Sequence, residues 1–197
     1  MHLFTRTQIL VAPSVEPVTL EETRAHLRVT HNEEDGVIDG LITAARVTVE
    51  MITRRSLITQ TIKLTIDEFP SSYTIRLPHT PVRSVSHIKY YDETGNLQTL
   101  SASKYWVDTV SAPARITLKE GESYPDTQKG RLNSVEITYI AGYGDTAADV
   151  PAPVKHAIKL LVSHLYENPD IVSAGQLFGV PMSCDYLLAP YRVLTFF

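Results

Sequence analysis

Apolar residues recur with the period of an α-helix from Val150 to Asn168. Five of them fall at positions i, i+3, i+4, i+7 and i+11, so they lie on one face of a helix. They are Val154, Ala157, Ile158, Leu161 and Leu165. Pro151 and Pro153 suit a first helical turn, whose N–H groups have no partner within the helix, and Asp149 is the expected N-cap. Pro169 ends the helix, because proline disfavours the α conformation in the residue before it.

A second helix with one apolar face is predicted upstream, between Asn32 and Arg54. Its stripe consists of Ile38, Leu41, Ile42, Ala45, Val49 and Ile52. Asn32 is its expected N-cap. A shorter helix begins at Thr19, since Thr19 and Glu22 have the spacing of a capping box. An amphipathic helix is stable only when another surface covers its stripe, so helices from the two ends of the chain are expected to pack together.

Between these helices the hydrophobic period changes from helical to two. Ile62, Leu64 and Ile66 alternate with polar residues, as in a strand that is buried on one face. Similar runs predict strands at residues 73–77, 85–91, 105–107, 115–118 and 135–139. Residues 92–96 read as a hairpin turn, and residues 121–130 as a polar surface loop. Short strands with frequent turns favour a small antiparallel sheet or sandwich.

The pattern as a whole predicts an α+β fold. In it, a helical bundle is formed by the N- and C-terminal helices, and an antiparallel β-rich domain is inserted between them. The expected organisation is an N-terminal extended arm at residues 1–17, a helical domain at 18–56 and 146–190, a β-rich insert at 57–145 and a docking tail at 191–197.

Composition limits the class of function. The chain has 197 residues and a formal net charge of −4, which argues against a protein that coats nucleic acid, since that role needs a basic surface. Cys184 is the only cysteine, so no disulfide forms within the chain and a reducing cytoplasmic origin is expected. No run approaches the roughly 20 apolar residues of a membrane span, and the N-terminus has no signal-peptide pattern. A soluble protein that is neither secreted nor anchored to a membrane is expected.

Candidate chemistry is sparse. His156 and His164 share a helix but lie two turns apart, about 12 Å along the axis, which is too far to bind one metal ion. No Gly-x-Ser-x-Gly elbow presents a catalytic serine. The turn Gly142–Asp145 precedes a helix, but it lacks the lysine and third glycine of a phosphate-binding loop. We therefore expect no catalytic residue, no metal and no cofactor.

Two other classes of function stay open on the residues alone. One is a carbohydrate- or protein-binding module that stacks its ligand on Trp106, Tyr105, Tyr90 and Tyr91 of the β-rich insert, although such residues are more often core or strand-pair residues. The other is an enzyme such as a glycosidase or nuclease.

Seven short motifs follow one another along the chain in a characteristic order. They are Pro17–Glu22 with Leu27–Val29, Leu57–Thr61, Leu77–Pro78, Pro81–Val85, Tyr139–Gly144, Val150–Pro153 and Leu187–Val193. In this order and spacing the chain resembles the head-tail connector (adaptor) proteins of long-tailed bacteriophages and prophages. The β-rich insert and the residues after Val193 differ from the all-helical members of that family.

The resemblance implies a structural, non-enzymatic role in a virion made in the bacterial cytoplasm. Copies would form a ring, expected to be dodecameric, under the portal vertex in the neck between head and tail. The ring would extend the DNA channel and receive the next neck protein, a stopper or tail-completion protein. Double-stranded DNA would pass through without sequence-specific binding, which a mildly negative chain permits.

The C-terminal segment is the predicted contact with the portal. It is strongly apolar for a chain end, where polar and frayed residues are usual. The predicted portal-docking residues are Leu187, Leu188, Tyr191, Arg192, Val193, Phe196 and Phe197. Tyr191 and Phe196 are the expected anchors, and Arg192 is expected to pair with a portal carboxylate. In the alternative interpretation the tail folds back and completes the core of its own subunit.

Overall fold

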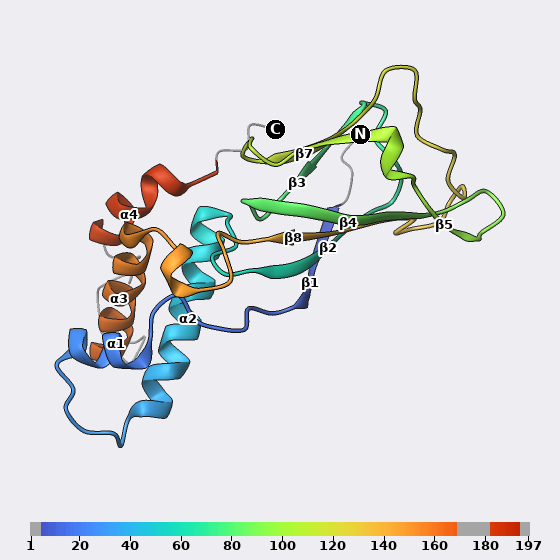
Figure 1. Ribbon diagram of the computed structural model, residues 1–197. Helices are drawn as coiled ribbons and strands as arrows, with labels where there is room; N and C mark the ends of the chain where they lie inside the picture. The colour runs from blue at the N-terminus through green and yellow to red at the C-terminus, as the bar shows by residue number, and fades with distance from the viewer. Residues whose placement is uncertain (1–4, 169–181, 194–197) are drawn as a thin grey trace, which may run out of the picture. The chain divides into compact units, whose positions relative to one another are not determined.

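The structure is a computed structural model, and residues 5–168 and 182–193 of it are described (Figure 1). The chain divides into two compact units. Met1–Pro13 and Thr59–Gly142 form one, here named the β unit, and Ser14–Ile58 and Tyr143–Phe197 form the other, the helical unit. Helices and antiparallel sheets are both present, so the predicted α+β class is confirmed.

The helical unit contains four α-helices among its described residues. They are α1 (Leu20–Leu27), α2 (Asp35–Thr53), α3 (Ala152–Glu167) and α4 (Met182–Leu188), with the 3-10 turns η2 (Ala147–Asp149) and η3 (Ala189–Tyr191). The predicted capping box starts α1: Glu22 N donates to Thr19 Oγ1 at 3.1 Å, and Thr19 N donates to the Glu22 carboxylate at 3.1 Å. The stripes of α2 and α3 then meet in one core, in which Ile38, Ile42 and Ile158 are almost fully buried.

Two predicted helix starts differ from the structure. The N-cap of α2 is Glu34, and Asn32 lies in the preceding turn, where its carbonyl accepts from Asp35 N at 3.2 Å. The N-cap of α3 is Pro151, whereas Asp149 caps the short turn η2. In both places a short turn comes before the helix. The spacing of apolar residues does not distinguish such a turn from the first turn of the helix, so the predicted N-cap is a few residues too early.

A buried ion-pair network fixes the middle of α2. Arg46 is only 7% exposed, and it donates to Glu16 at 2.7 Å and to Glu50 at 3.0 Å. The other oxygen of Glu50 accepts from Leu57 N at 2.9 Å. A buried charge is costly unless it is paired and hydrogen-bonded, and here Arg46 has two carboxylates. The network thus joins the segment before α1, the helix α2 and the segment after α2.

The β unit contains two antiparallel sheets. Their strands are β1 (Thr5–Val11), β2 (Gln60–Ile66), β3 (Thr74–Leu77), β4 (Val82–Tyr91), β5 (Leu97–Thr99), β6 (Tyr105–Asp108), β7 (Ala114–Leu118) and β8 (Val135–Ala141). One sheet has the order β1-β2-β8-β4-β5 and the other the order β3-β7-β6. Alternate residues of both sheets, such as Ile62, Ile116 and Ile137, fill a common core. Strand β1 lies within the residues expected to form an extended arm, and it pairs with β2.

The predicted surface loop at 121–130 contains no helix or strand, and its Tyr124 packs against the β unit. The ring of Tyr124 stacks on Phe69 with centroids 4.5 Å apart, and its hydroxyl donates to the carbonyl of Tyr73 at 3.2 Å. Burial raises the pKa of Tyr124 to about 12. Tyr124 is therefore an aromatic contact between the loop and the rest of the β unit, beside the hydrogen bond from Gln128 N to the Tyr91 carbonyl.

The turn before α3 is closed by Asp149. Its carboxylate accepts from Thr146 N at 2.9 Å and from Thr146 Oγ1 at 2.8 Å. A Cβ added at Gly144 would lie 2.2 Å from Cγ of Asp149, so only glycine leaves room for this cap. By contrast, a Cβ at Gly40 in α2 meets no atom within 4 Å.

Replacing Gly144 by alanine is expected to lower the free energy of unfolding by about 1–3 kcal/mol, because the new methyl group displaces the Asp149 cap. The matched control is Gly40→Ala, which is expected to leave stability unchanged or raise it by up to about 1 kcal/mol, since alanine favours a helix interior. Chemical denaturation measures both. Equal stability of Gly144→Ala and the wild type would contradict this account of the turn.

Replacing Tyr124 by alanine is expected to destabilise the β unit by about 2 kcal/mol, because a half-buried aromatic ring is removed. Tyr124→Phe removes only the hydroxyl and is expected to cost about 1 kcal/mol. Lys129→Ala, an exposed change in the same loop, is the control and is expected to change stability by less than about 0.5 kcal/mol. Thermal melts compare the three. If Lys129→Ala were as damaging as Tyr124→Ala, the loop would not be held through Tyr124.

Candidate functional site

The predicted docking residues divide into buried and accessible side chains. Leu188 is fully buried and Val193 is 8% exposed, so in this structure both side chains belong to the interior of the helical unit. Leu187 and Tyr191 are half-buried and pack against the same core, while Arg192 is exposed. Phe196 and Phe197 lie outside the described residues.

The backbone after α4 is attached to the end of α2. Val193 N donates to the carbonyl of Thr53 at 3.0 Å, and Arg55 Nε donates to the carbonyl of Tyr191 at 2.6 Å. Arg192 reaches back to Asp185 at 2.9 Å. Residues 189–193 are therefore an ordered part of the helical unit. Hydrogen bonds fix their backbone to the end of α2, and Arg192 is bonded to Asp185.

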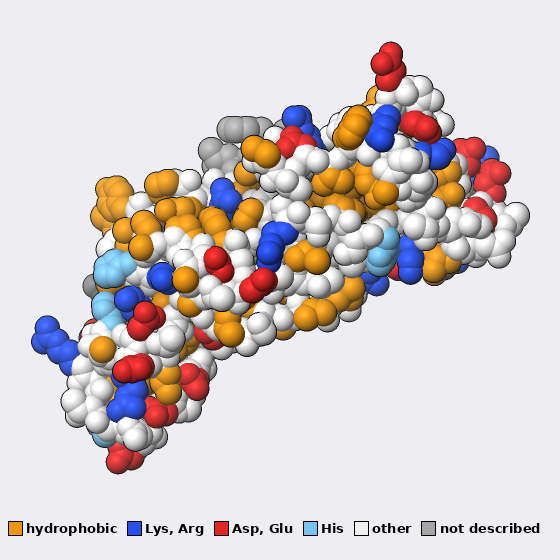
Figure 2. Space-filling model, viewed as in Figure 1, with side chains coloured by type: hydrophobic (Ala, Val, Ile, Leu, Met, Phe, Trp, Pro, Cys, Tyr) orange, Lys and Arg blue, Asp and Glu red, His pale blue; other side chains and the backbone are white. Residues whose placement is uncertain are grey.

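An apolar surface lies on the outer side of α4, and two of its residues were not predicted. Met182 and Tyr186 are 73% and 75% exposed, one helical turn apart. The term α4 surface is used below for the group of side chains formed by Met182, Tyr186, Leu187, Pro190 and Tyr191. Figure 2 shows hydrophobic side chains gathered on the part of the molecule that carries α4. The burial of Cys184 and Leu188 places residues 182 and 186 on the opposite side of α4, and the i,i+4 spacing of Met182 and Tyr186 is the sequence signal that these two share a face.

The α4 surface has the composition of a protein-binding surface. Exposed aromatic and methionine side chains are enriched in interfaces, and large aromatic residues contribute most of the binding energy. Arg192 and Asp185 form a charged pair beside it, with side chains 40% and 49% exposed. An exposed pair of this kind contributes little to stability and is accessible to a partner's charges.

No metal cluster is found among residues 5–168 and 182–193. The rings of His26 and His156 meet edge to face, with centroids 6.0 Å apart. Burial lowers the pKa of His26, and the nearby Lys159 and His156 lower it further. A proton on His26 is thus disfavoured, which suits packing between α1 and α3 and does not indicate a catalytic acid.

The glycine-containing turn before α3 does not form a phosphate cradle. The carboxylate of Asp149 occupies the space beside Gly144 and accepts the backbone N–H of Thr146. An anion placed there would be repelled by that carboxylate.

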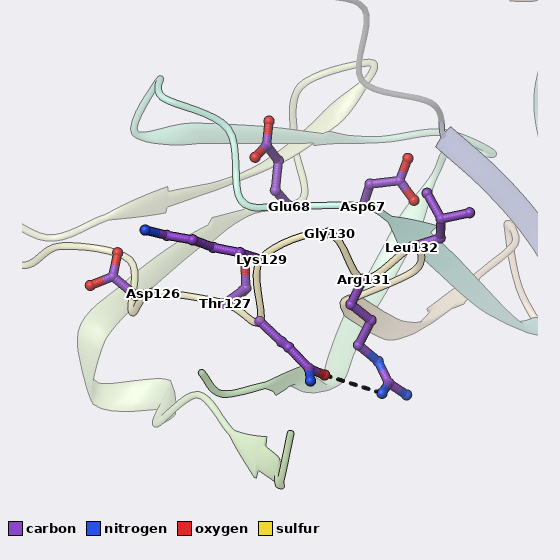
Figure 3. A pocket seen from close by; sticks show the side chains of 9 residues that line it. Asp67, Glu68, Asp126, Thr127, Lys129, Gly130, Arg131 and Leu132 are labelled. Carbon is purple, nitrogen blue, oxygen red and sulfur yellow. Dashed lines mark hydrogen bonds between the residues drawn. The ribbon is translucent and has the colours of Figure 1, made fainter. Parts of the chain in front are cut away.

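A shallow hollow of about 360 Å³ lies beside the loop of the β unit (Figure 3). It is lined by Asp67, Glu68 and residues 126–132. Asp67 already accepts from Asn133 N at 2.8 Å, and Gln128 accepts from Arg131 at 3.3 Å. Figure 3 shows the charged side chains fanning outward instead of converging on one point, so the hollow presents no paired acid and base.

The four aromatic residues considered for ligand stacking do not share one surface. Tyr105 and Trp106 are consecutive in β6 and project to opposite faces: Tyr105 is 7% exposed in the core, and Trp106 is 65% exposed beneath Lys119. Tyr90 packs against the core of the β unit. The ring of Tyr91 is covered by the Arg131 guanidinium, 3.5 Å from its centroid.

In the part of the chain that the structure describes, no helix is both long enough and apolar enough to span a bilayer.

Three solved structures have nearly the same fold along their whole length. A chain in the neck of an empty gene transfer agent (GTA) particle, computed with C6 symmetry, has a TM-score of 0.82 at 23% identity, with 98% of this chain and 97% of that chain covered. A chain in the virion of the native GTA particle has a TM-score of 0.81 at 23% identity, covering 97% of each. A chain in the native GTA neck, computed with C12 symmetry, has a TM-score of 0.74 at 22% identity, covering 96% and 97%. At this identity the likeness shows the fold.

A search of curated proteins gives no match. The sequence profile of the "Phage gp6-like head-tail connector protein" family matches residues 17–113. The match includes α1, α2 and most strands of the β unit, and with them the first four motifs of the resemblance. The resemblance to head-tail connector proteins is therefore confirmed over residues 17–113, which match the model of this family.

Proposed function

We propose that this protein is a structural, non-enzymatic connector in the neck of a phage-like virion. The family match over residues 17–113 carries the proposal. The agreement of fold with chains from GTA necks along nearly the full length supports it, because it extends beyond the matched residues to α3 and α4. The protein would be made in the bacterial cytoplasm and assembled into the virion between head and tail.

In this proposal copies of the chain form a ring under the portal. Twelve copies are expected, in keeping with the C12 and C6 symmetries used for the related necks. A closed ring needs two unlike surfaces on every copy, because each copy contacts its two neighbours through different faces. The helical bundle would give each subunit its fold, and the ring would extend the DNA channel. DNA would pass without being bound at particular sequences, and a stopper or tail-completion protein would follow the ring.

The α4 surface is the part of the described chain that we propose for docking on the portal. Met182 and Tyr186 would be its principal contacts, with Leu187 and Tyr191 beside them, and Arg192 would exchange Asp185 for a portal carboxylate. Two hydrogen bonds support this assignment, from Val193 N to the Thr53 carbonyl and from Arg55 Nε to the Tyr191 carbonyl, since they fix the backbone beside α4 before binding. Such preorganisation lowers the entropic cost of association. Phe196 and Phe197 remain proposed contacts.

The isolated protein is expected to be a monomer or a weak oligomer that forms a ring only on its portal, because each unit has a core of its own. Native mass spectrometry of the chain, alone and mixed with the portal protein of the same virus, measures this. A tight dimer that persists on dilution, with its helices buried across a two-fold axis, would contradict the proposed ring.

The double substitution Met182→Ser with Tyr186→Ser is expected to weaken portal binding by about 2 kcal/mol or more, roughly 30-fold, because it removes two exposed apolar contacts. The melting temperature should stay near that of the wild type, since both side chains are largely exposed. The matched control is Leu132→Ser in the β unit, where an apolar side chain of 72% exposure is removed. A pull-down with portal measures binding. Unchanged binding by the double variant would show that α4 is not the docking surface.

A further inference from the structure

Strand β1 is paired through its backbone but is barely covered by its own subunit. Every residue from Arg6 to Ala12 is exposed, and Ile9, Leu10 and Val11 are 51%, 46% and 58% exposed. The neighbouring strand differs sharply: Ile9 is in register with Ile62 and Thr7 with Leu64, and both partners on β2 are buried. The core thus ends at β2, and β1 extends beyond it with apolar side chains on both faces.

Because β1 is an edge strand, its outer backbone groups are also left without partners in the described part of the chain. It is the first strand in the order β1-β2-β8-β4-β5, so its outer backbone N–H and C=O groups have no neighbouring strand among the described residues. Proteins usually shorten, charge or cover such an edge, because it is a template for another strand. β1 is seven residues long, and Arg6 is the one charged residue in its sequence, so the edge is neither short nor highly charged.

The opposite edge of the same sheet is also exposed, and its charge has the opposite sign. All three residues of β5 are exposed, and Leu97 is 48% exposed. The turn that leads into β5 carries Asp92 and Glu93. Hydrogen bonds from Thr94, Gln98 and Asn96 lower the pKa of Asp92 to about 2, so its carboxylate stays charged at neutral pH.

Among the described residues, the surface beside β1 carries one basic side chain that is not in an ion pair. Gln8 is in register with Lys63, and a hollow of about 350 Å³ there is lined by Arg6 and Lys63 together with polar residues and Glu136. Lys63 pairs with Glu136 at 3.6 Å, whereas Arg6 has no ion-pair partner within the described chain. One edge of the sheet therefore presents a basic group with apolar residues, and the other presents acidic groups with an apolar residue.

We propose that β1 of one copy of this chain lies against β5 and the 92–96 turn of the next copy. The two edges are unlike and lie at opposite ends of one strand order, which is the arrangement that a head-to-tail contact in a ring requires. Pairing with the three residues of β5 would satisfy part of the outer backbone groups of β1, cover Ile9 and Leu10, and place Arg6 near Asp92 and Glu93. The inference rests on the proposed ring and assigns its subunit contact.

The first test captures the partner of β1. A photo-crosslinking amino acid replaces Leu10 in the full-length chain, and the protein is irradiated at concentrations up to millimolar. Crosslinked dimers should increase with concentration, and mass spectrometry should place the second attachment within residues 92–99. An attachment to β1 of the second copy or to the helical unit, or a lack of dimers at the highest concentration, would overturn the proposal.

The second test exchanges the charges of the two edges in the crosslinking protein. The β1 variant carries Arg6→Glu with Ile9→Glu, and the β5 variant carries Glu93→Arg with Leu97→Arg. Either variant alone should yield about tenfold less dimer than the wild type, because like charges face each other. A mixture of the two should recover the dimer, since each altered edge then meets a complementary one. If the β5 variant alone still formed dimers, β1 would pair by another route and the proposal would fail.

Electron microscopy of particles assembled on the portal separates this inference from the proposed function. Wild-type rings together with no rings from the β1 variant would support both. If the wild type and the β1 variant both formed rings, the connector role would still be supported and the β1 contact would be overturned. If the wild type formed no ring, the proposed function would fail, and the crosslink from position 10 would still decide the contact. Thermal melts of both variants exclude unfolding as the cause, since all four substituted side chains are exposed.

Discussion

The buried guanidinium of Arg46 is the constraint on which the helical unit depends. Its two carboxylates come from different parts of the chain: Glu16 lies before α1, and Glu50 lies one turn further along α2. Glu50 also accepts the N–H of Leu57, so the same charge fixes the chain as it leaves α2. Removing one partner would leave a charge unpaired in the interior, which is far more costly than losing an exposed ion pair. The network ties the flanking segments to α2, and the chain at the end of α2 then binds residues 191–193 through Thr53 and Arg55.

Each unit has a complete core and still leaves apolar side chains outside it. In the helical unit these are on α4, where the buried stripe of Cys184 and Leu188 leaves Met182 and Tyr186 on the opposite side. In the β unit they are on β1, which the second sheet does not cover. Exposed apolar groups in ordered elements mark contacts with other chains when they cluster. A connector in a virion neck needs both a contact with its neighbours and a contact with the portal, and these two surfaces supply one candidate for each.

Assembly and fold stability are separable in such a design. The residues that build the cores, such as Ile42, Ile158 and Ile137, are buried, whereas Met182, Tyr186 and the residues of β1 are exposed. Substitution of an exposed residue on α4 or β1 thus tests binding without removing core packing. Shortening the buried side chain of Leu188 would instead test the stability of the fold. A subunit with a core in each unit keeps the residues that stabilise it distinct from the exposed residues proposed for assembly.

The sequence by itself determined the α+β class, the capping box at Thr19, the buried stripe of α3 and the alternation of β2, because local spacing reports which face of an element is buried. It also supplied the family resemblance that the profile match confirmed over residues 17–113. Only the tertiary structure decided that β1 pairs with β2, since strand pairing depends on a register with residues at least fifty positions away. The same holds for the tail: Leu187 and Leu188 are chemically identical neighbours, and their different burial follows from how α4 packs against the core. Periodicity gives the faces of an element, but the partner of each face is set by packing between distant segments.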